Sequence, residues 1–555
     1  TYGEDVLLAT EMGLATIEGY QGNNLADAYH VAACMKHFLG YSMPRTGKDR
    51  TPVYIDEIQL REYFLPTFQA AINAGAATVM INSGELNGIP VHADKKILTD
   101  LLRSELGFKG VAVTDWEDIM KLNNIHMVAP TLKDAVYMAI DAGIDMCMVP
   151  NDYDFTILLT ELVKEGKISE ARLDVSVKRI LELKKQLGLF EQPFTPANTD
   201  YKKFGSTEFA RAAQNMAEES ITLLKNNNQV LPIQQSAKIL VTGPAANSMT
   251  YLNGAWTRTW QGSDTIWNDQ SKYTIREAFN PATTTFIASD NMSDADVREK
   301  MFTAAKASDV IIICLGEKPS TEKVGDIDAL TMPDNQQQLV GLLKSTGKPV
   351  VLVLVENRPL IVNDIEPLCD AIVLAYEPGD YGGLALANII YGKVNPSGKL
   401  PFTYPRHEAS LLWYDHKHTE TLDQTFGRKA FNPQWEFGYG LSYTTFQYSN
   451  LKISNDTLST GNLQISVDVT NTGTTTGKEV VQFYIADRYA SITPSVKRLR
   501  GFEKVEIKPG ATHIVTFTIS AKDLAFVGRD EKWISEAGWF DIMLGSEKSS
   551  FYLSK

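Results

Sequence analysis

The chain has 555 residues, of which 44% are hydrophobic and 22% are charged, and its formal net charge is -14. This length exceeds what a single hydrophobic core supports, so we expect two to four domains in a globular protein. The acidic balance argues against nucleic acid as a partner, because phosphate binding depends on lysine and arginine. No apolar run approaches 20 residues, so we predict no membrane insertion.

Residues 1–190 are predicted to alternate helices and strands. The predicted helices are 4–22, 56–75, 95–110, 131–143 and 170–190, and the predicted strands are 31–40, 76–83, 111–116 and 144–150. Their nearly continuous apolar strands are typical of a parallel sheet covered by helices. Polar side chains follow the strands, as at the carboxyl ends of a β/α barrel. A closed barrel needs eight strands, and four also fit an open doubly wound sheet. We expect these residues to be the C-terminal half of a barrel whose N-terminal half is missing from this chain.

The rest of the chain is predicted to form two further domains. Residues 191–215 contain proline, asparagine and threonine and are predicted to be a linker. Residues 216–405 contain four apolar strands and helices, which indicates an α/β sandwich domain with a parallel sheet. A connecting segment, 406–444, follows. Residues 445–555 alternate apolar and polar positions between Asn-Thr-Gly and Pro-Gly turns, which favours an antiparallel β-sandwich of immunoglobulin or fibronectin type. The fold class is therefore α/β with a terminal β-sandwich.

Common cofactor and metal motifs are absent from the sequence. There is no G-x-x-x-x-G-K-[ST], no G-x-S-x-G and no H-E-x-x-H. The four cysteines lie in or beside apolar runs, without a C-x-x-C pair or a suitably spaced histidine: Cys34, Cys147, Cys314 and Cys369. We therefore expect buried free thiols, no metal and no cofactor. The remaining candidates for chemistry are carboxylates and aromatic residues at strand ends.

Asp115 ends the apolar strand "VAVTDW". Two carboxylates that flank a glycosidic bond are the usual equipment of glycoside hydrolysis, and this position suits one of them. An aspartate between a strand and a helix is also a common helix N-cap. The pattern alone favours neither interpretation. A second candidate region, "GEKPSTEKVGDIDALTMPDNQ", contains Glu317 and Glu322, and its composition by itself favours a solvated acidic loop.

Eight motifs, taken in chain order, favour the catalytic interpretation of these carboxylates. They are "VAACMKHFLG", "LREYFLPTF", "VAVTDW", "AEESITLLKNNNQVLPI", "GAWTRTWQG", "GKLPFTYP", "FGYGLSYTTF" and "RLRGFEKVEIKPG". Together they resemble glycoside hydrolase family 3, the β-glucosidase-like exo-glycosidases, over essentially the whole chain. The resemblance implies a β/α barrel, an α/β sandwich and a fibronectin type III-like domain.

The resemblance also implies roles for individual residues. Asp115 matches the nucleophile, and Glu322 matches the general acid/base, with Glu317 in reserve. The implied substrate-binding residues are Lys36, His37, Ser83, Trp116 and Trp260. Lys36 and His37 match residues that hydrogen-bond sugar hydroxyls, and the two tryptophans match plates that grip the next sugar. Because a nucleophile must be ionised, we expect Lys36 and His37 to lower the pKa of Asp115.

The implied activity is that of an exo-acting retaining β-glucosidase. It would release glucose from the non-reducing end of β-glucans, xyloglucan-type or cello-oligosaccharides by double displacement. Two alternatives are open: a β-xylosidase or arabinofuranosidase of the same family, and a non-catalytic carbohydrate-binding relic. The expected partners are β-linked glucosides and a separate N-terminal fragment that completes the barrel. By resemblance alone, we expect an extracytoplasmic location.

Overall fold

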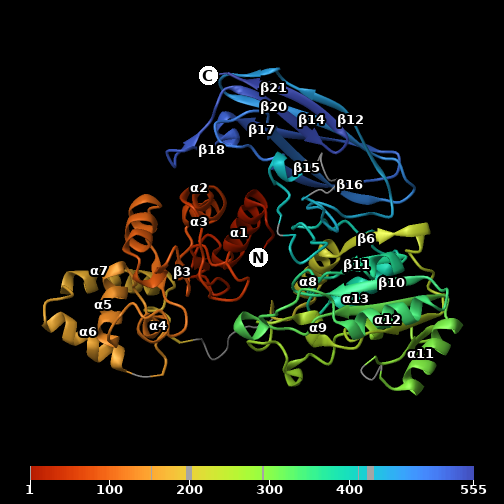
Figure 1. Cartoon of the computed structure of the whole chain (residues 1–555), viewed down its shortest axis with the longest axis horizontal. Coiled ribbons are helices and arrows are strands. Elements are labelled where there is room, and N and C mark those ends of the chain that lie inside the picture. The colour runs from red at the N-terminus through yellow and green to blue at the C-terminus, as the bar shows by residue number, and fades with distance from the viewer. Residues whose placement is uncertain are drawn as a thin grey trace. The chain divides into compact units, whose positions relative to one another are not determined.

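The computed structural model describes residues 2–151, 153–194, 203–289, 293–410, 412–421 and 430–554. The contacts between residues divide the chain into two compact units. The first unit contains Thr1–Thr199 and Phe526–Ile534, and the second contains Asp200–Ala525 and Ser535–Lys555. Residues 2–151 and 153–194 of the first unit run from red to yellow in Figure 1.

A parallel sheet forms the centre of the first unit. Its strands, in the order β1-β2-β5, are β1 (Cys34–Phe38), β2 (Thr78–Ile81) and β5 (Val111–Val113). A parallel bridge between Val113 and Met146 continues the sheet beyond β5. The four predicted strand positions are therefore recovered, although the fourth is only a bridge. The described residues do not form an eight-stranded barrel, and the assignment to half of one is not confirmed.

Helices surround this sheet. They are α1 (Val6–Gln21), α2 (Glu57–Gln59), η1 (Leu60–Phe64), α3 (Leu65–Asn73), η2 (Val91–Ala93), η3 (Lys96–Glu105), α4 (Asp118–Asn124), α5 (Leu132–Ala142), α6 (Asp154–Lys164) and α7 (Glu170–Gln186). A hairpin of β3 (Glu85–Leu86) and β4 (Ile89–Pro90) lies between β2 and η2. The sequence explains α5 well, because Thr131 accepts a hydrogen bond from the Asp134 N–H and Gly143 ends the helix with φ of 134°. The sequence prediction missed α6 and also α4, whose seven residues are too few to show a strong helical period.

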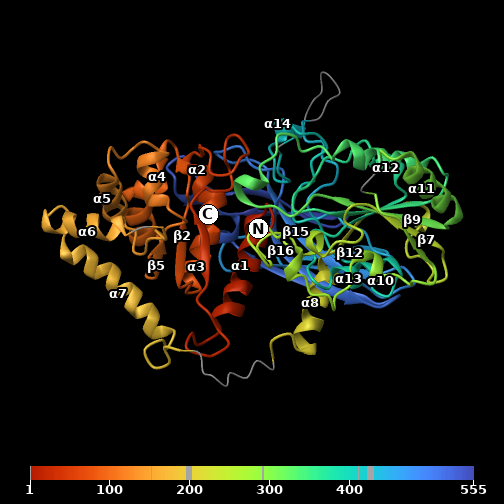
Figure 2. The ribbon, with the colours of Figure 1, turned by 90° about the horizontal axis from the view of Figure 1, so that it is seen from below.

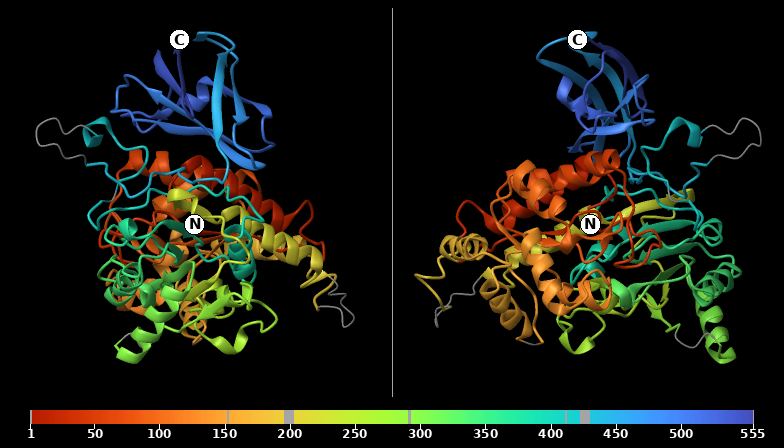
Figure 3. Two further views of the ribbon diagram at one scale, coloured as in Figure 1. Left: turned by 90° about the vertical axis from the view of Figure 1, so that its right-hand side faces the viewer. Right: turned by 60° about the vertical axis from the view of Figure 1, so that its left-hand side comes forward.

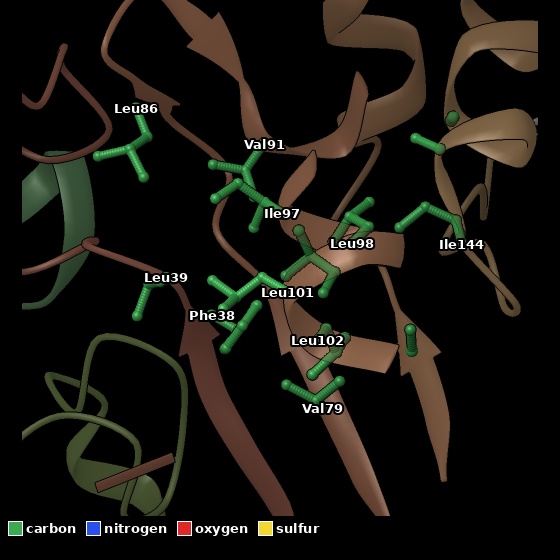
Figure 4. Packing of buried hydrophobic residues seen from close by; sticks show 14 of the residues in the cluster. Phe38, Leu39, Val79, Leu86, Val91, Ile97, Leu98, Leu101, Leu102 and Ile144 are labelled. Atoms are coloured by element: carbon green, nitrogen blue, oxygen red, sulfur yellow. The ribbon is translucent and has the colours of Figure 1, made fainter. Parts of the chain in front are cut away.

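The core of the first unit supports the strand ends. Figure 4 shows Phe38 from β1 and Val79 from β2 close to three leucines of η3, Leu98, Leu101 and Leu102. Phe38 and Val79 are completely buried. Full burial of an apolar side chain of this size stabilises a fold by roughly 1.5–3 kcal/mol. Buried Phe38 therefore anchors the end of β1, the strand that carries Lys36 and His37.

The second unit contains a six-stranded sheet in the order β6-β11-β10-β9-β7-β8. Its strands are β6 (Thr222–Asn226), β7 (Ile239–Thr242), β8 (Thr284–Phe286), β9 (Val310–Gly316), β10 (Val350–Val355) and β11 (Ala371–Leu374). All neighbours pair in parallel except β6, which runs antiparallel to β11. The four predicted strands of this domain, β7, β9, β10 and β11, are parallel to one another, whereas the edge strands β6 and β8 were not predicted. An antiparallel edge strand on a parallel sheet is a common arrangement.

Helices cover both faces of this sheet, as predicted. One face packs on α8 (Thr207–Ser220), α10 (Ile275–Ala278) and α13 (Gly382–Ile390), and the other on α11 (Ala295–Ala307) and α12 (Asp334–Lys344). Figure 2 shows α11 and α12 on one side of β7 and β9, with α10 and α13 on the other. Neighbouring residues of β9 divide between the two cores, Ile312 with the first set of helices and Ile313 with the second.

The predicted linker, 191–215, is partly helical, because α8 begins at Thr207. Residues 195–202 of that linker lie outside the described residues. Ion pairs connect the end of α8 to the C-terminal β-sandwich. The carboxylate of Glu219, near the end of α8, forms ion pairs with Lys478 and Lys504.

The C-terminal strands form the expected β-sandwich, shown in blue in Figure 3. One sheet has the order β12-β14-β17 and the other β13-β21-β20-β15-β16. The strands are β12 (Phe446–Ile453), β13 (Thr457–Leu458), β14 (Asn462–Asn471), β15 (Gly477–Asp487), β16 (Arg498–Ile507), β17 (Thr512–Ser520), β20 (Gly538–Leu544) and β21 (Glu547–Leu553). One hydrophobic core lies between the sheets. All pairings are antiparallel except that of β13 with β21.

A hairpin inside the predicted domain 445–555 belongs to the first unit. Its strands are β18 (Phe526–Val527) and β19 (Trp533–Ile534). The backbone N–H of Val527 donates a hydrogen bond of 3.1 Å to Oε2 of Glu62, a buried residue of η1. The hairpin therefore satisfies a buried carboxylate that lies 465 positions earlier in the chain.

Glu356 is a buried carboxyl group that directly follows β10. Its side chain is 3% exposed, and Oε1 lies 2.8 Å from the hydroxyl of Tyr404. That hydroxyl also lies 2.6 Å from the carbonyl oxygen of Leu360. A phenol has one proton, so if Tyr404 donates to Leu360, Glu356 must carry a proton and donate to Tyr404. Burial raises the pKa of Glu356 to about 8, which agrees with the protonated form.

Glu356 is therefore expected to make stability depend on pH. An unfolded glutamate ionises near 4.5, whereas folded Glu356 keeps its proton up to about pH 8. Between pH 4.5 and about pH 8, folded Glu356 keeps a proton that unfolded Glu356 has lost. The stabilisation that this group contributes is therefore fully present below pH 4.5 and is lost as the pH rises toward 8. The free energy of unfolding should fall by up to about 1.4 kcal/mol per pH unit over this range. Urea unfolding at pH 5, 6, 7 and 8 should show a shallower slope in Glu356→Gln.

The control for this measurement is Glu299→Gln, which changes an exposed glutamate of α11 in the same unit. It should keep the slope of the unmodified protein. Equal slopes in Glu356→Gln and the unmodified protein would show that Glu356 is ionised in the folded state.

Candidate active site

Asp115 follows β5, after one buried residue, Thr114. The N-cap of the next helix, α4, is Glu117, and the Asp115 carboxylate accepts instead from the neighbouring Trp116 N–H at 2.6 Å. Asp115 is therefore not the cap of α4, which removes the structural alternative that the sequence left open. Its side chain is 14% exposed, so the carboxylate is partly shielded and can still be reached by a ligand.

Three side chains surround this carboxylate. One belongs to β1, one to the segment after β1, and one to the segment after β2. The guanidinium of Arg50 donates from Nη2 to Oδ2 of Asp115 at 2.9 Å, and the hydroxyl of Ser83 lies 3.0 Å from the same oxygen. Nε2 of His37 lies 3.9 Å from Oδ2. The parallel sheet brings these residues together because its strands end at one edge.

The contacts of Asp115 keep it ionised. Burial alone would raise its pKa, but the hydrogen bonds from Arg50, Trp116 N–H and Ser83 outweigh burial and lower the pKa to about 2. Burial and the charge of Lys36 lower the pKa of His37 to about 4, despite the opposing charge of Asp115. His37 is thus neutral at pH 7. The expectation that Lys36 and His37 would hold Asp115 ionised is therefore corrected: Arg50 does so.

Arg50 is a site residue that sequence reasoning missed. It lies in the loop "RTGKDR", which has no regular period and gives no sign of where its side chains point. The backbone of Arg50 has φ of 58°, in the left-handed region that non-glycine residues seldom adopt. Arg50 also forms an ion pair with its neighbour Asp49. These contacts orient the guanidinium toward Asp115.

Ser83 lies beside the Asp115 carboxylate. It is 3% exposed, and its hydroxyl lies between Oδ2 of Asp115 and Oδ2 of Asp118, at 2.7 Å from the latter. Asp118 is also buried, and Lys121 Nζ donates to it at 2.6 Å. Ser83 therefore holds the candidate nucleophile rather than presenting its hydroxyl to solvent, and Asp118 is a further residue that the sequence prediction missed.

The other predicted contacts of the first unit are accessible. Lys36 is exposed on β1, and Trp116 is 52% exposed. The backbone carbonyl of Trp116 accepts a hydrogen bond of 2.7 Å from Lys121 Nζ, which holds the loop while the indole remains open. An exposed aromatic face beside a charged carboxylate suits a ligand with both apolar and polar surfaces, such as a sugar.

Glu322 lies in the loop after β9, at the start of the short helix η7 (Glu322–Gly325). It is half-buried, and its backbone φ is 55°. Nε1 of Trp260 donates to Oε1 of Glu322 at 3.2 Å, so the structure brings together two residues that the sequence assigned separately to the site. The Trp260 indole is 47% exposed.

Glu317 occupies a different environment in the same loop. It follows directly after β9, and Nε of Arg358 lies 3.0 Å from each of its two carboxylate oxygens. Burial raises the pKa of Glu317, and the contacts with Arg358 oppose that rise. This carboxylate is thus held by an ion pair, whereas Glu322 is held by an indole.

Other classes of site are not found among the residues that the structure describes. No group of three or more histidine, cysteine, aspartate or glutamate side chains there could hold a metal ion. Within the same residues, no helix is long and apolar enough to cross a membrane. The four cysteines are free thiols, but Cys34 is exposed, so the expectation of burial is wrong for that residue.

Comparison with protein families identifies the class of protein. The N-terminal domain model of glycosyl hydrolase family 3 matches residues 1–183, and the C-terminal domain model of that family matches residues 221–443. A fibronectin type III-like domain matches residues 479–548. The chain belongs to glycosyl hydrolase family 3 and is a glycoside hydrolase. Because the N-terminal domain model matches from residue 1, the expectation of a missing barrel half is not supported.

Curated relatives cover nearly the whole chain. A lysosomal beta glucosidase of Dictyostelium discoideum is 42% identical over 100% of this chain and 70% of its own length. A periplasmic beta-glucosidase of Salmonella typhimurium is 33% identical, over 99% of this chain and 76% of its own length. A beta-xylosidase of Formosa agariphila is 34% identical, over 99% of this chain and 79% of its own length. These relatives include enzymes named for two different sugars.

The fold is also similar to solved structures. The beta-glucosidase from Listeria innocua in complex with isofagomine superposes with a TM-score of 0.92 at 29% identity, over 99% of this chain and 79% of that one. The architecture of an N-terminal domain, an α/β sandwich and a fibronectin type III-like domain is thus confirmed at the level of the family.

Proposed function

We propose that this glycoside hydrolase is an exo-acting retaining β-glucosidase. It releases glucose from the non-reducing end of β-glucans, xyloglucan-type or cello-oligosaccharides by double displacement. The observation that carries the proposal is Asp115, a carboxylate kept ionised by Arg50 and placed beside the exposed indole of Trp116. In a retaining mechanism, one carboxylate attacks the anomeric carbon and a second gives and then recovers a proton.

Asp115 is proposed as the nucleophile. It must be ionised to attack, and its low pKa supports that state at any physiological pH. The hydrogen bond from Arg50 to Oδ2 also orients the carboxylate, while Trp116 N–H binds Oδ1. Neutral His37 can donate to or accept from a sugar hydroxyl, and exposed Lys36 adds a cationic donor. Trp116 and Trp260 each offer an exposed aromatic face on which a sugar ring can stack.

Glu322 is proposed as the general acid/base, ahead of Glu317. A general acid must deliver a proton to the leaving oxygen, so a carboxylate held on both oxygens by an arginine is poorly placed for that role. The two oxygens of Glu317 are both engaged by Arg358, which leaves that group suited to holding the loop. Glu322 accepts a hydrogen bond from Nε1 of Trp260, the aromatic residue of the same unit that is assigned to the site.

The second candidate function is that of a β-xylosidase, because one relative of similar identity is named a beta-xylosidase. The two sugars differ by the hydroxymethyl group on C5 of glucose. The exposed Trp116 and the half-exposed Trp260 can stack on either ring. The family membership supports hydrolysis over the third alternative, a non-catalytic binding relic.

A panel of aryl glycosides tests the proposal. We expect kcat/KM to be highest for 4-nitrophenyl β-D-glucoside, lower for the β-D-xyloside and the α-L-arabinofuranoside, and undetectable for α-D-glucoside. With cellotetraose, glucose and cellotriose should appear first, and the first glucose anomer seen by NMR should be β. A higher kcat/KM for the β-D-xyloside would identify a xylosidase, and a first α-anomer would refute the retaining mechanism.

We also propose an extracytoplasmic location. Two relatives are named lysosomal and periplasmic, which are both compartments outside the cytoplasm. β-Linked oligosaccharides from polysaccharide breakdown are available in such compartments, which agrees with the proposed substrate class.

A further inference from the structure

The carboxamide of Gln261 pairs with the backbone of Thr321. Its Nε2 donates to the Thr321 carbonyl oxygen at 3.1 Å, and its Oε1 accepts from the Thr321 N–H at 3.0 Å. A primary amide carries a donor and an acceptor side by side, so it can satisfy both backbone groups of one residue at once. Thr321 directly precedes Glu322, so this pairing acts on the peptide that leads into the proposed acid/base.

The backbone at Glu322 needs such support. Its φ of 55° lies in the left-handed region, which is unfavourable for residues with a Cβ atom. A residue in this conformation persists when its surroundings hold it. Gln261 holds the peptide before Glu322, and the neighbouring Trp260 binds the Glu322 carboxylate at 3.2 Å. Two consecutive side chains therefore determine both the backbone and the carboxylate position.

The segment that carries Trp260 and Gln261 is itself compact. The Trp256 N–H donates to the Trp260 carbonyl oxygen at 3.0 Å. At Gly262, φ is 70° and an added Cβ would lie 2.2 Å from the Gly254 carbonyl oxygen, so only glycine fits there. The segment is therefore closed on itself and can present Gln261 in a defined direction.

The Glu322 loop is also held from the segment after β10. Asn357 Nδ2 donates to the carbonyl oxygen of Ser320 at 3.1 Å. Gln261, which belongs to the segment of Trp256 to Gly262, binds the backbone of the following residue, Thr321. Two successive residues before Glu322 are thus bound by amide side chains from two separate parts of the second unit.

We propose that Gln261 is a positioning residue for Glu322 in the glycosidase reaction. By binding both backbone groups of Thr321, it keeps the Glu322 carboxyl aimed at the leaving-group oxygen. The inference rests on the proposed role of Glu322 as general acid/base. Without Gln261, the Glu322 backbone is free to leave the left-handed conformation, and proton transfer to the leaving group slows.

The test is a series of aryl β-D-glucosides whose leaving groups range from 2,4-dinitrophenol to phenol. Gln261→Met keeps the length of the side chain and removes both hydrogen bonds. We expect kcat/KM to fall about 10- to 100-fold for the phenyl glucoside, part of the full contribution of a general acid. For the 2,4-dinitrophenyl glucoside, which leaves without a proton, the fall should be less than about threefold. A steeper dependence on the leaving group is the signature of a misplaced acid.

Gln261→Glu provides a second variant. Its carboxylate can still accept from the Thr321 N–H but cannot donate to the Thr321 carbonyl, so its loss should be intermediate. If Gln261→Met does not fold, the leaving-group dependence of Gln261→Glu tests the positioning role instead. The matched control is Gln270→Met, which changes an exposed glutamine nine residues later and should leave all rates unchanged.

The outcomes separate the positioning role from the proposed function. Equal losses with every leaving group in Gln261→Met, or no loss, would overturn the positioning role. Glu322→Ala measured with the same series reports the proposed function itself. A steep dependence in Glu322→Ala without one in Gln261→Met would refute only the inference about Gln261. A flat response in Glu322→Ala would refute the acid/base assignment and the inference with it.

Discussion

Asp115→Asn is expected to lower kcat/KM for aryl β-D-glucosides by on the order of 10⁴-fold or more, because the amide cannot attack the anomeric carbon. The substitution keeps the shape of the side chain, and its single amide oxygen can still accept from Arg50, while the NH2 group takes the place of the oxygen that accepts from the Trp116 N–H. The fold should therefore survive, and the loss should lie in the rate of glycosylation. Steady-state kinetics with 4-nitrophenyl β-D-glucoside measure the effect.

Two further variants make the Asp115 experiment decisive. Asp100→Asn, at an exposed aspartate of η3 in the same unit, should keep full activity. In Asp115→Gly, added azide can occupy the space of the carboxylate and attack from the same side. The product should be α-glucosyl azide. Substantial residual activity in Asp115→Asn, or a β-azide product, would show that another residue is the nucleophile.

Glu322→Ala should have the second largest effect. We expect kcat/KM for phenyl β-D-glucoside to fall by about 10²- to 10⁴-fold, the usual contribution of a general acid. Glucosides with an activated leaving group should lose far less in this step. Since azide needs no general base, it should accelerate turnover of the glucosyl-enzyme and give β-glucosyl azide. The basic limb of the pH profile of kcat/KM should also disappear.

The controls for Glu322 come from the same loop. Asp328→Asn changes an exposed acid six residues later and should behave as the unmodified enzyme. Glu317→Gln disturbs the pair with Arg358 and should lower the thermal unfolding midpoint without making activity depend more steeply on the leaving group. If Glu317→Gln shows that dependence and Glu322→Ala does not, the general acid is Glu317.

The strands and the order of the domains could be predicted from local patterns. The apolar run before Asp115 is a strand, and the period-two alternation after residue 445 is a β-sandwich, because side-chain periodicity follows directly from backbone geometry. The edge strand β6 and its antiparallel direction were not predicted. Its five residues look the same in either direction, and only pairing with β11 decides the orientation.

The sequence by itself determined the candidate residues of the site, since Asp115, Trp116, Trp260 and Glu322 lie in motifs that resemble those of the family. It did not determine how these groups are held. Arg50 lies 65 positions from Asp115, and Gln261 lies 60 positions from Thr321. Such contacts depend on where two loops meet after the sheets have formed, and no local pattern encodes that. Only the tertiary structure decided that Arg50 keeps Asp115 charged, that Ser83 is buried against it, and that Gln261 supports the Glu322 loop.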